Sequence, residues 1–310
     1  MDQDSRRRAL FAAALALCAT PWVGAATALV LGIAFSLGLG NPWPAGSARA
    51  SKIILQLSVV GLGFGLRLDE VLQTGRSSFA YTLVGITGTL TLGYVLGRLF
   101  RTDQNTSALI SFGTAICGGS AIAALAPVLK AKNEETAVAL ATVFTLNAIA
   151  LLLFPAIAHL LQLDQGTFGI WAGLAIHDTS SVVGAASVYG TQALAIGTTV
   201  KLTRALWITP VVLGLAFMKR SEQKARVPLF IVGFLLAAAL STFLPQLANI
   251  WGGLAALARK CLVVTLFLIG AGLSREVLKK VGVRPLLQGL TLWLLVSGLT
   301  LAALLGLGAG

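Results

Sequence analysis

The stretch AIHDTSSVV, residues 175–183, places five consecutive polar side chains in the middle of an apolar run. A single helix cannot turn five adjacent side chains to one face, because successive residues point in different directions around its axis. In a lipid bilayer, exposed polar groups find no hydrogen-bond partner, so a continuous lipid-facing helix is excluded here. We expect the backbone to break or to line a cavity at this point. The alternative is a polar contact buried between neighbouring helices.

The composition of the whole chain places that run in a membrane. Hydrophobic residues make up 56% of the 310 residues and charged residues only 11%, whereas a soluble domain carries about 25% charged residues. A disordered chain, a fibrous protein and a soluble nucleic-acid-binding protein are therefore excluded. Cys18, Cys117 and Cys261 stand alone, without a CxxC pair or a neighbouring histidine, so we expect no disulfide, no metal site and no cofactor.

Apolar runs bounded by charged residues, proline or glycine recur along the chain and predict eleven membrane spans. Most are long enough, since roughly 20 apolar residues cross about 30 Å of hydrocarbon. No connecting segment is long enough to fold as a soluble domain, so we expect residues 1–310 to form a single membrane transporter domain. The runs cover residues 9–20, 22–40, 53–66, 77–97, 106–129, 136–161, 166–189, 191–218, 227–246, 254–273 and 283–307.

The basic residues predict how these spans are oriented. If all eleven cross and the N-terminus is cytoplasmic, fifteen basic residues lie on the cytoplasmic side and six on the other. If the short run 9–20 does not cross, the balance becomes nine against twelve, which contradicts the tendency of cytoplasmic loops to be positive. We therefore expect a cytoplasmic N-terminus and a C-terminus on the far side. The six are Arg67, Arg76, Lys130, Lys132, Arg259 and Lys260.

The first run also permits a second interpretation. Three arginines, Arg6, Arg7 and Arg8, precede a short apolar stretch that small residues follow. That order is typical of a cleaved signal peptide, which remains the alternative to a first span.

One short motif occurs twice. Gly63-Phe64-Gly65-Leu66 with Glu70-Val71-Leu72 resembles Gly270-Ala271-Gly272-Leu273 with Glu276-Val277-Leu278. By the charge count the two copies end on opposite sides of the membrane. Opposite orientation of similar segments indicates inverted-topology repeats, which place a substrate site near the midplane. The alternative is chance recurrence, because small residues are common where membrane helices touch.

Four ionisable residues lie near the middle of predicted spans, namely His177, Asp178, Lys201 and Arg204. A charge at bilayer depth costs several kcal/mol unless it is paired or faces water, so each is a candidate for function. We assign His177, Asp178, Thr179, Ser180 and Ser181 to the coupling proton or ion.

Lys201 and Arg204 lie on one helical face at positions i and i+3. Two cations repel each other there unless an anion or Asp178 lies between them. One carboxylate cannot neutralise both, so the site carries a charge of about +1 with neutral His177 and suits a small anion. The alternative is that both side chains extend to the membrane surface.

The fifth run contains Cys117-Gly118-Gly119-Ser120 at its centre. Paired glycines weaken a helix, and Ser120 is a suitable N-cap for a second half-helix that begins there. A half-helix N-terminus presents unpaired N–H groups that bind oxyanions. We assign Cys117, Gly118, Gly119 and Ser120, with Lys201 and Arg204, to substrate binding. The alternatives are close helix packing for the glycines, and either a core thiol or a nucleophile for Cys117.

The stretch from Ala115 to Ala124 (AICGGSAIAA) resembles the YeiH-type sulfate exporter family. The likeness continues through Glu134-Glu135-Thr136, Trp171-Ala172-Gly173, Ile176-His177-Asp178, Lys201, Arg204 and Pro210 and covers nearly the whole chain. The family often has Glu where this chain has Asp178. The resemblance implies a bacterial inner-membrane protein whose fold is grouped with cation–proton antiporters and bile-acid symporters, with inverted repeats and crossed, broken helices. It leaves open whether the fifth or seventh run is re-entrant or the tenth run is the fifth run's inverted partner.

These observations predict an all-α integral membrane protein with about eleven transmembrane helices. We expect a secondary transporter, not an enzyme, that moves sulfate or a small sulfonate by alternating access, coupled to protons or sodium. Its partners would be a small anion, the bilayer and, in a homodimer, a second copy, with no nucleic acid. The chain has no GxxxxGK[ST] loop, so it does not drive transport with ATP by that motif. The alternatives are an anion channel and a membrane enzyme that uses Cys117 or His177.

Overall fold

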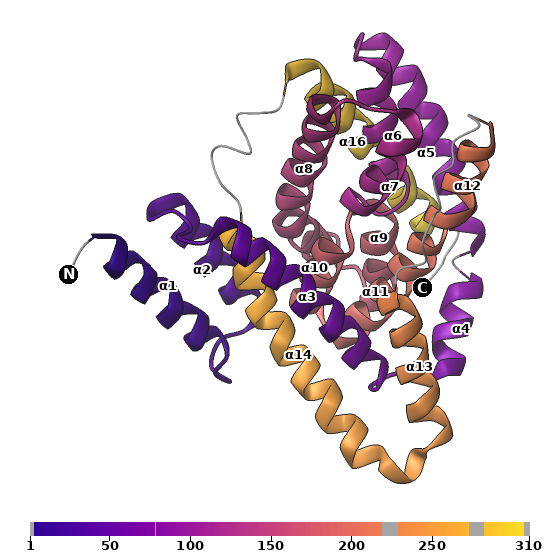
Figure 1. Cartoon of the computed structure of the whole chain (residues 1–310). Coiled ribbons are helices and arrows are strands. Elements are labelled where there is room, and N and C mark those ends of the chain that lie inside the picture. Colours follow the sequence, from indigo (N-terminus) through magenta and orange to yellow (C-terminus); the bar gives the residue numbers. More distant parts are fainter. Residues whose placement is uncertain (1–2, 78, 219–228, 273–281, 307–310) are drawn as a thin grey trace. The chain divides into compact units, whose positions relative to one another are not determined.

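The computed structural model describes residues 3–77, 79–218, 229–272 and 282–306, and this part of the chain is helical, without a β-strand. Each of the eleven apolar runs coincides with one helix or with two consecutive helices (Figure 1). The chain packs as two units of two stretches each, residues 1–71 with 229–277 (unit 1) and residues 72–228 with 278–310 (unit 2). The expected membrane domain is thus divided into two packing units.

In unit 1, α14 lies against both α2 and α3, and α3 also packs on α13. The side chain of Phe11 in α1 meets Phe35 and Phe267 edge to face, with ring centroids 5.3 and 5.2 Å away. The helices of unit 1 are α1 (Gln3–Cys18), α2 (Ala25–Gly38), α3 (Pro44–Gly63), α13 (Leu229–Phe243) and α14 (Ala248–Ala271), with the 3-10 helix η1 (Pro245–Leu247) before α14 and the start of α4 (Leu68–Ser77).

The two glycines that open the repeated motif let helix backbones touch in unit 1. A Cβ atom on Gly63 would lie 2.5 Å from the backbone oxygen of Phe234 in α13. A Cβ atom on Gly270 would lie 2.5 Å from the backbone oxygen of Leu29 in α2. Any larger residue would push these helices apart. The contact of α3 with α13 and the contact of α14 with α2 therefore both depend on a glycine. The last part of the second copy, residues 276–278, lies outside the described residues.

Two basic residues of unit 1 correct the sequence analysis. Arg259 and Lys260 were counted among the loop charges on the far side of the membrane, but they lie inside α14. The Lys260 ammonium group donates a hydrogen bond to the backbone oxygen of Thr20. A helix accommodates such charges where a long basic side chain can reach a distant polar partner.

Unit 2 holds the helices that carry the candidate site. The end of α5 packs against the start of α6, and α16 lies against α5, α6, α8 and α9. The helices are α5 (Phe79–Leu99), α6 (Gln104–Ala115), α7 (Gly119–Leu129), α8 (Asn133–Leu160), α9 (Gln165–Ala175), α10 (Thr179–Tyr189), α11 (Thr191–Leu206), α12 (Ile208–Met218) and α16 (Val283–Gly306).

The fifth apolar run does not cross as one helix, because α7 folds back on α6. A Cβ atom on Gly113 would lie 2.9 Å from Cδ1 of Ile122, whereas one continuous helix would separate these residues by about 13 Å. At the other end, Nδ2 of Asn105 donates to Oε2 of Glu135 at 3.1 Å. The start of α6 therefore lies beside the start of α8. We call α6 and α7 hairpin 1, with its tip at residues 116–118.

The seventh run folds back in the same way. Phe168 near the start of α9 stacks on Tyr189 at the end of α10, with ring centroids 4.0 Å apart, whereas a continuous helix would separate them by about 31 Å. The Tyr189 hydroxyl donates to the backbone oxygen of Leu163, just before α9. We call α9 and α10 hairpin 2, with its tip at residues 176–178. Its base lies at the far end of α8, where the rings of His159 and Tyr189 are 4.6 Å apart.

The two hairpins change the count of predicted crossings. Both runs were expected to span the membrane. Hairpin 1 instead begins and ends beside the start of α8, and hairpin 2 begins and ends beside the far end of α8. In the part of the chain that the structure describes, four helical segments are long and apolar enough to cross alone: α5, α8, α16 and the segment Pro245–Ala271. The bent pair α3 and α4 makes a fifth if it is one span. Hydropathy predicts eleven crossings because it measures the length of an apolar run and not the direction of its second half.

Candidate functional site at the two hairpin tips

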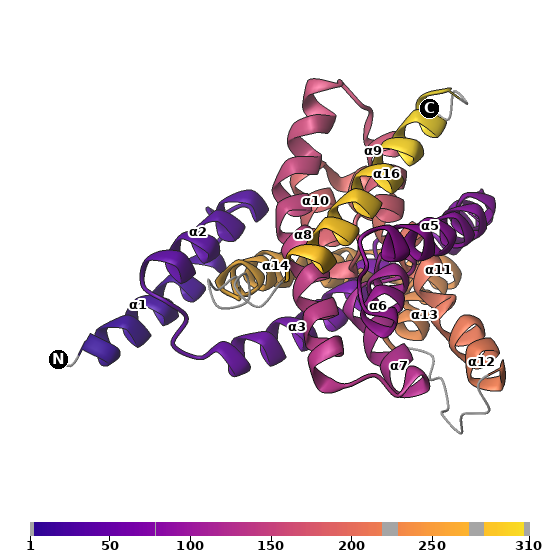
Figure 2. The same ribbon diagram turned by 90° about the horizontal axis from the view of Figure 1, so that it is seen from above.

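The tips of hairpins 1 and 2 meet beside the middle of α8. Helix α8, labelled in Figure 2, packs against α6, α7 and α10. A Cβ atom on Gly118 would lie 3.0 Å from the Cβ atom of Asp178. Gly118 also has a φ of +67°, which favours glycine because that conformation strains residues with a side chain. Both requirements point to the same residue, so hairpin 1 can turn and touch hairpin 2 only with glycine here.

Asn147 holds hairpin 2 to the centre of α8. Its side-chain oxygen accepts a hydrogen bond from the backbone N–H of His177 at 3.2 Å, and its side-chain nitrogen donates to Oδ2 of Asp178. The residue is only 2% exposed. The sequence analysis missed Asn147, although an amide at the centre of an apolar run is a signal of this kind.

Asp178 is the N-cap of α10. Its Oδ1 accepts from the Ser181 backbone N–H and from the Ser180 hydroxyl, each at 2.6 Å. Its Oδ2 accepts from the Ser181 hydroxyl at 3.1 Å and from Asn147. The carboxylate is therefore surrounded by donors and lies against the positive end of the α10 dipole. Thr179 begins α10 and is partly exposed.

Lys201 and Arg204 are buried and bind the carbonyl ends of both hairpins. The Lys201 ammonium group donates to the backbone oxygen of Ile176 at 2.7 Å. Arg204 donates from Nε to Ala115 at 2.6 Å, from Nη2 to Thr114 at 3.1 Å and from Nη1 to Leu174. These oxygens lie at the C-terminal ends of α6 and α9, where a helix leaves carbonyls unpaired and carries partial negative charge.

The hairpin carbonyl groups explain why Lys201 and Arg204 can lie close together on one face of α11. The sequence analysis expected an anion or Asp178 to separate them, and it treated extension to the membrane surface as the alternative. Both side chains instead point inward, with Lys201 0% and Arg204 1% exposed. The carbonyl ends of the two hairpins supply the compensating negative charge. All three guanidinium nitrogens of Arg204 are engaged with backbone oxygens, so this residue is above all a structural clamp.

The N-terminus of α7 differs from the other three helix ends at the tips. Its N-cap is Gly118, and no side chain caps it. The sequence analysis placed the N-cap at Ser120, but the helix begins at Gly119, so Ser120 lies in its first turn. The residue is exposed. The positive end of α7 is thus open where Cys117, Gly118, Gly119 and Ser120 were assigned to substrate.

His177 and Cys117 occupy the middle of the two tips, and both are buried. Neither ring nitrogen of His177 makes a hydrogen bond with a described residue, although the Val143 backbone is close enough to interact with the ring. Among the residues described, no cluster of three or more His, Cys, Asp or Glu side chains could hold a metal ion.

The two hairpins also share a sequence pattern that the sequence analysis missed. Asp103 caps α6 through the N–H groups of Asn105 and Thr106, and Asp164 caps α9 through those of Gly166 and Thr167. Backbone and hydroxyl donors hold the pKa of each carboxyl below its usual value. In sequence, Asp-Gln-x-Thr occurs at 103–106 and 164–167, and Gly-x-Ala-Ile-x-x-x-Ser at 113–120 and 173–180.

Comparison with known proteins identifies the family. The family model described as "Conserved hypothetical protein 698" matches residues 8–289. A UPF0324 membrane protein of Geobacter sulfurreducens is 68% identical over 98% of both chains. The chain belongs to the UPF0324 membrane protein family. Another UPF0324 protein, from Bdellovibrio bacteriovorus, is 50% identical over 98% of this chain and 96% of its own.

A third UPF0324 relative, from Vibrio vulnificus, is 47% identical over 97% of this chain and 99% of its own length. No solved structure matches the chain. The relatives are bacterial membrane proteins by their names, which agrees with the apolar helices of this chain. This UPF0324 protein is therefore a bacterial membrane protein, and both hairpins lie inside the matched region.

Proposed function

We propose that this UPF0324 protein is a secondary transporter of a small oxyanion, sulfate or a small sulfonate, that works by alternating access. The anion would bind at the open N-terminus of α7, between the two hairpin tips. The observation that carries the proposal is the missing cap at Gly118 beside a capped partner helix. The resemblance to YeiH-type sulfate exporters supports the choice of anion.

The charge around the tips favours an anion. Lys201 and Arg204 contribute two positive charges and Asp178 one negative charge, which leaves about +1 when His177 is neutral. The four helix ends cancel, because two N-termini and two C-termini carry about half a charge each. An oxyanion at α7 would neutralise the remaining charge and would accept hydrogen bonds from N–H groups in the first turn.

The hairpins support an inverted repeat. Hairpin 1 with α8, and hairpin 2 with α11 and α12, have the same order of elements and begin at opposite ends of α8. The contacts are also reciprocal, since Asn147 in α8 binds the tip of hairpin 2 and Arg204 in α11 binds the tip of hairpin 1. In unit 1, Gly63 and Gly270 make a second reciprocal pair. Transporters with inverted repeats bind substrate where the two copies meet.

The positive-inside tendency becomes stronger when both hairpins are re-entrant. Nine crossings then replace eleven, and the termini keep their proposed sides, cytoplasmic for the N-terminus and outside for the C-terminus. Lys130 and Lys132 move to the cytoplasmic side, so the split changes from fifteen against six to seventeen against four. Two of the four, Arg259 and Lys260, lie inside α14. A more uneven split is what the tendency predicts for the correct topology.

His177 and Asp178 would couple transport to protons, with Thr179, Ser180 and Ser181 lining the same tip. His177 is buried without a hydrogen bond to a described residue, so a change of its charge would be strongly felt by its surroundings. Purified protein in proteoliposomes tests the coupling through labelled sulfate flux under an imposed pH gradient. A flux that follows a sodium gradient and ignores pH would transfer the role to the oxygen ligands of hairpin 2.

Ser120 provides the decisive test of the anion site. Ser120→Asp would place a carboxylate in the first turn of α7, which stabilises a helix by about 0.3–1 kcal/mol but fills the position of the substrate charge. We expect a melting temperature equal to or above that of the unaltered protein, and loss of sulfate counterflow in proteoliposomes. Ser120→Asn is the matched neutral control and should keep most of the counterflow. Normal counterflow with Ser120→Asp would exclude the anion from α7.

The same preparations separate the two other functional classes. An anion channel would give unitary currents in a planar bilayer, at rates that alternating access does not reach. An enzyme that uses Cys117 or His177 would turn over a substrate in detergent, where no gradient exists. We expect neither unitary currents nor turnover in detergent.

A further inference from the structure

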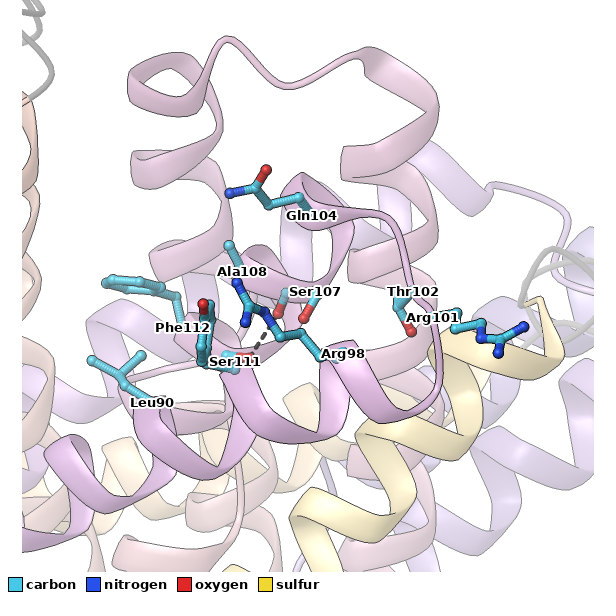
Figure 3. A pocket seen from close by; sticks show the side chains of 11 residues that line it. Leu90, Arg98, Arg101, Thr102, Gln104, Ser107, Ala108, Ser111 and Phe112 are labelled. Carbon is cyan, nitrogen blue, oxygen red and sulfur yellow. Dashed lines mark hydrogen bonds between the residues drawn. The ribbon is translucent and has the colours of Figure 1, made fainter.

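A cavity of unit 2 lies between α5 and α6, where it is lined by residues from Leu90 to Phe112. Its volume is about 400 Å³, which lies in the range of small-molecule sites. Figure 3 shows its lining, which includes Arg98, Ser107, Ser111 and Phe112. The Ser111 hydroxyl donates to the backbone oxygen of Ser107 at 2.7 Å. The cavity therefore has a polar wall on α6 and an arginine on α5.

Arg98 reaches across this cavity. Its guanidinium carbon lies 4.6 Å from the centre of the Tyr94 ring, which also lines the cavity. In Figure 3 the side chain extends toward Ala108 and Ser107 of α6, whereas Arg101 points away at the rim. A ring face beneath a guanidinium group holds it in place without neutralising its charge.

Among the described residues that line the cavity, none carries a carboxylate. Two acids at the starts of α6 and α8 are already engaged. Asp103 accepts from the first turn of α6, and Glu135 accepts from Asn105 and from the Lys132 backbone. Neither Arg98 nor Arg101 forms an ion pair with a described residue. The cavity thus has the positive charge of Arg98 in its lining and that of Arg101 at its rim, and neither is paired with a described acid.

The lining changes character along α5. Arg98 lies in the last turn of this candidate span, where charged side chains meet lipid headgroups. Leu90 lies eight residues earlier, about 12 Å deeper along the helix, opposite Phe112. A ligand that fills the cavity therefore needs a negative group at one end and an apolar group at the other. That combination describes a phospholipid and not a free phosphate ion.

We propose that the cavity between α5 and α6 binds one anionic phospholipid, with its phosphate at Arg98 and the start of its acyl chains toward Leu90 and Phe112. The phosphate would accept hydrogen bonds from the guanidinium group, and Gln104 would lie within the headgroup region. The site uses residues of unit 2 alone and does not depend on the proposed transport function.

Binding of defined lipids to the purified full-length protein tests the site. Native mass spectrometry would compare dioleoylphosphatidylglycerol with dioleoylphosphatidylcholine at equal concentrations. We expect preferential retention of the anionic lipid, and Arg98→Ala should weaken that retention about fivefold, as the loss of one basic contact predicts. The matched control is Arg76→Ala, which removes an exposed arginine of unit 2 outside the cavity and should leave retention unchanged.

Two further arms keep the result interpretable. Ala108→Phe fills the cavity without a change of charge, so it should also displace the lipid if the cavity holds it. Inorganic phosphate should fail to compete at concentrations at which phosphatidylglycerol binds. Equal retention of both lipids, an equal loss with Arg76→Ala, or full competition by phosphate would each overturn the proposal. Unaltered retention with Ala108→Phe would overturn it as well.

Discussion

Hairpins 1 and 2 each have a three-residue break at the tip, and the helices that follow, α7 and α10, are equal in length. The two hairpins differ in how the N-terminus of that second helix is capped. At hairpin 2, Asp178 supplies a carboxylate to α10 from within the chain. At hairpin 1, Gly118 supplies no side chain to α7. The difference shows what an external anion could do at α7, because it would take the place that Asp178 occupies at α10. The substrate would then be a temporary cap that completes the pair.

The largest effect we expect concerns the sides from which the two hairpins open. Single cysteines at Ala131 and Gln162, in a background without the three native cysteines, should be labelled by a membrane-impermeant maleimide from opposite faces. Ala131→Cys should react only from the cytoplasmic side and Gln162→Cys only from outside. Labelling of both from the same face would contradict the opposed hairpins.

The next largest effect is a difference in stability between the loss of Arg204, which binds carbonyl groups of both hairpins, and the loss of Lys201, which binds hairpin 2 alone. Arg204→Met leaves carbonyl groups of α6 and α9 unpaired, and the loss of a buried charged partner costs about 3–5 kcal/mol. Lys201→Met frees only the Ile176 carbonyl and should cost about 1–3 kcal/mol. We expect that order in melting temperatures measured by size-exclusion chromatography of heated samples.

Arg76→Met, at an exposed position, is the control for the loss of a positive charge. This expectation differs from the assignment made from the sequence, in which both cations bind substrate. A stable Arg204→Met protein without transport would favour the substrate role over the clamp.

The smallest effect concerns the matched caps at the bases of the hairpins. Asp103→Ala and Asp164→Ala should each lower stability by about 0.5–1 kcal/mol at neutral pH, as the loss of an exposed N-cap does. Because the native pKa of each carboxyl is lowered, its stabilisation is complete above about pH 4–5, near the unfolded pKa. The stabilisation is lost as pH falls through the lower native pKa.

The stability of the unaltered protein should fall between about pH 5 and pH 2. Because each cap variant lacks one of the carboxylates that cause this fall, its stability should fall less over the same range. Melting temperatures at successive pH values measure this directly. Glu134→Ala is a suitable control, since Glu134 makes no hydrogen bond or ion pair with the described residues. An unchanged acid profile in both aspartate variants would show that neither cap contributes.

Much of the fold could be predicted because hydropathy and local chemistry determine it. The eleven apolar runs are helical, and the polar stretch 177–181 and the glycines at 118 and 119 marked the positions of the breaks. The direction of each second half could not be predicted from periodicity, because a helix that continues and one that folds back have the same pattern. The repeat at 103–106 and 164–167 was the available signal that both runs follow one plan.

The candidate site was predicted in its residues but not in its contacts. His177, Asp178, Lys201 and Arg204 do gather at the tips, as the cost of charge at bilayer depth requires. Their partners are mostly backbone carbonyl and N–H groups, which every residue carries and which the sequence therefore does not display. Asn147 was missed because its amide side chain is neutral, and the cost of charge at bilayer depth selects only ionisable residues.

The single long helix α8 between the hairpins has a consequence for the origin of the protein. A segment made of one re-entrant hairpin and one crossing helix ends on the side opposite to its start. A tandem duplication of such a segment therefore inverts the second copy automatically. In the topology that we propose, no ancestral protein that inserts in both orientations is needed, and one aligned position, Gly118 in one hairpin and Asp178 in the other, distinguishes the open hairpin from the capped one.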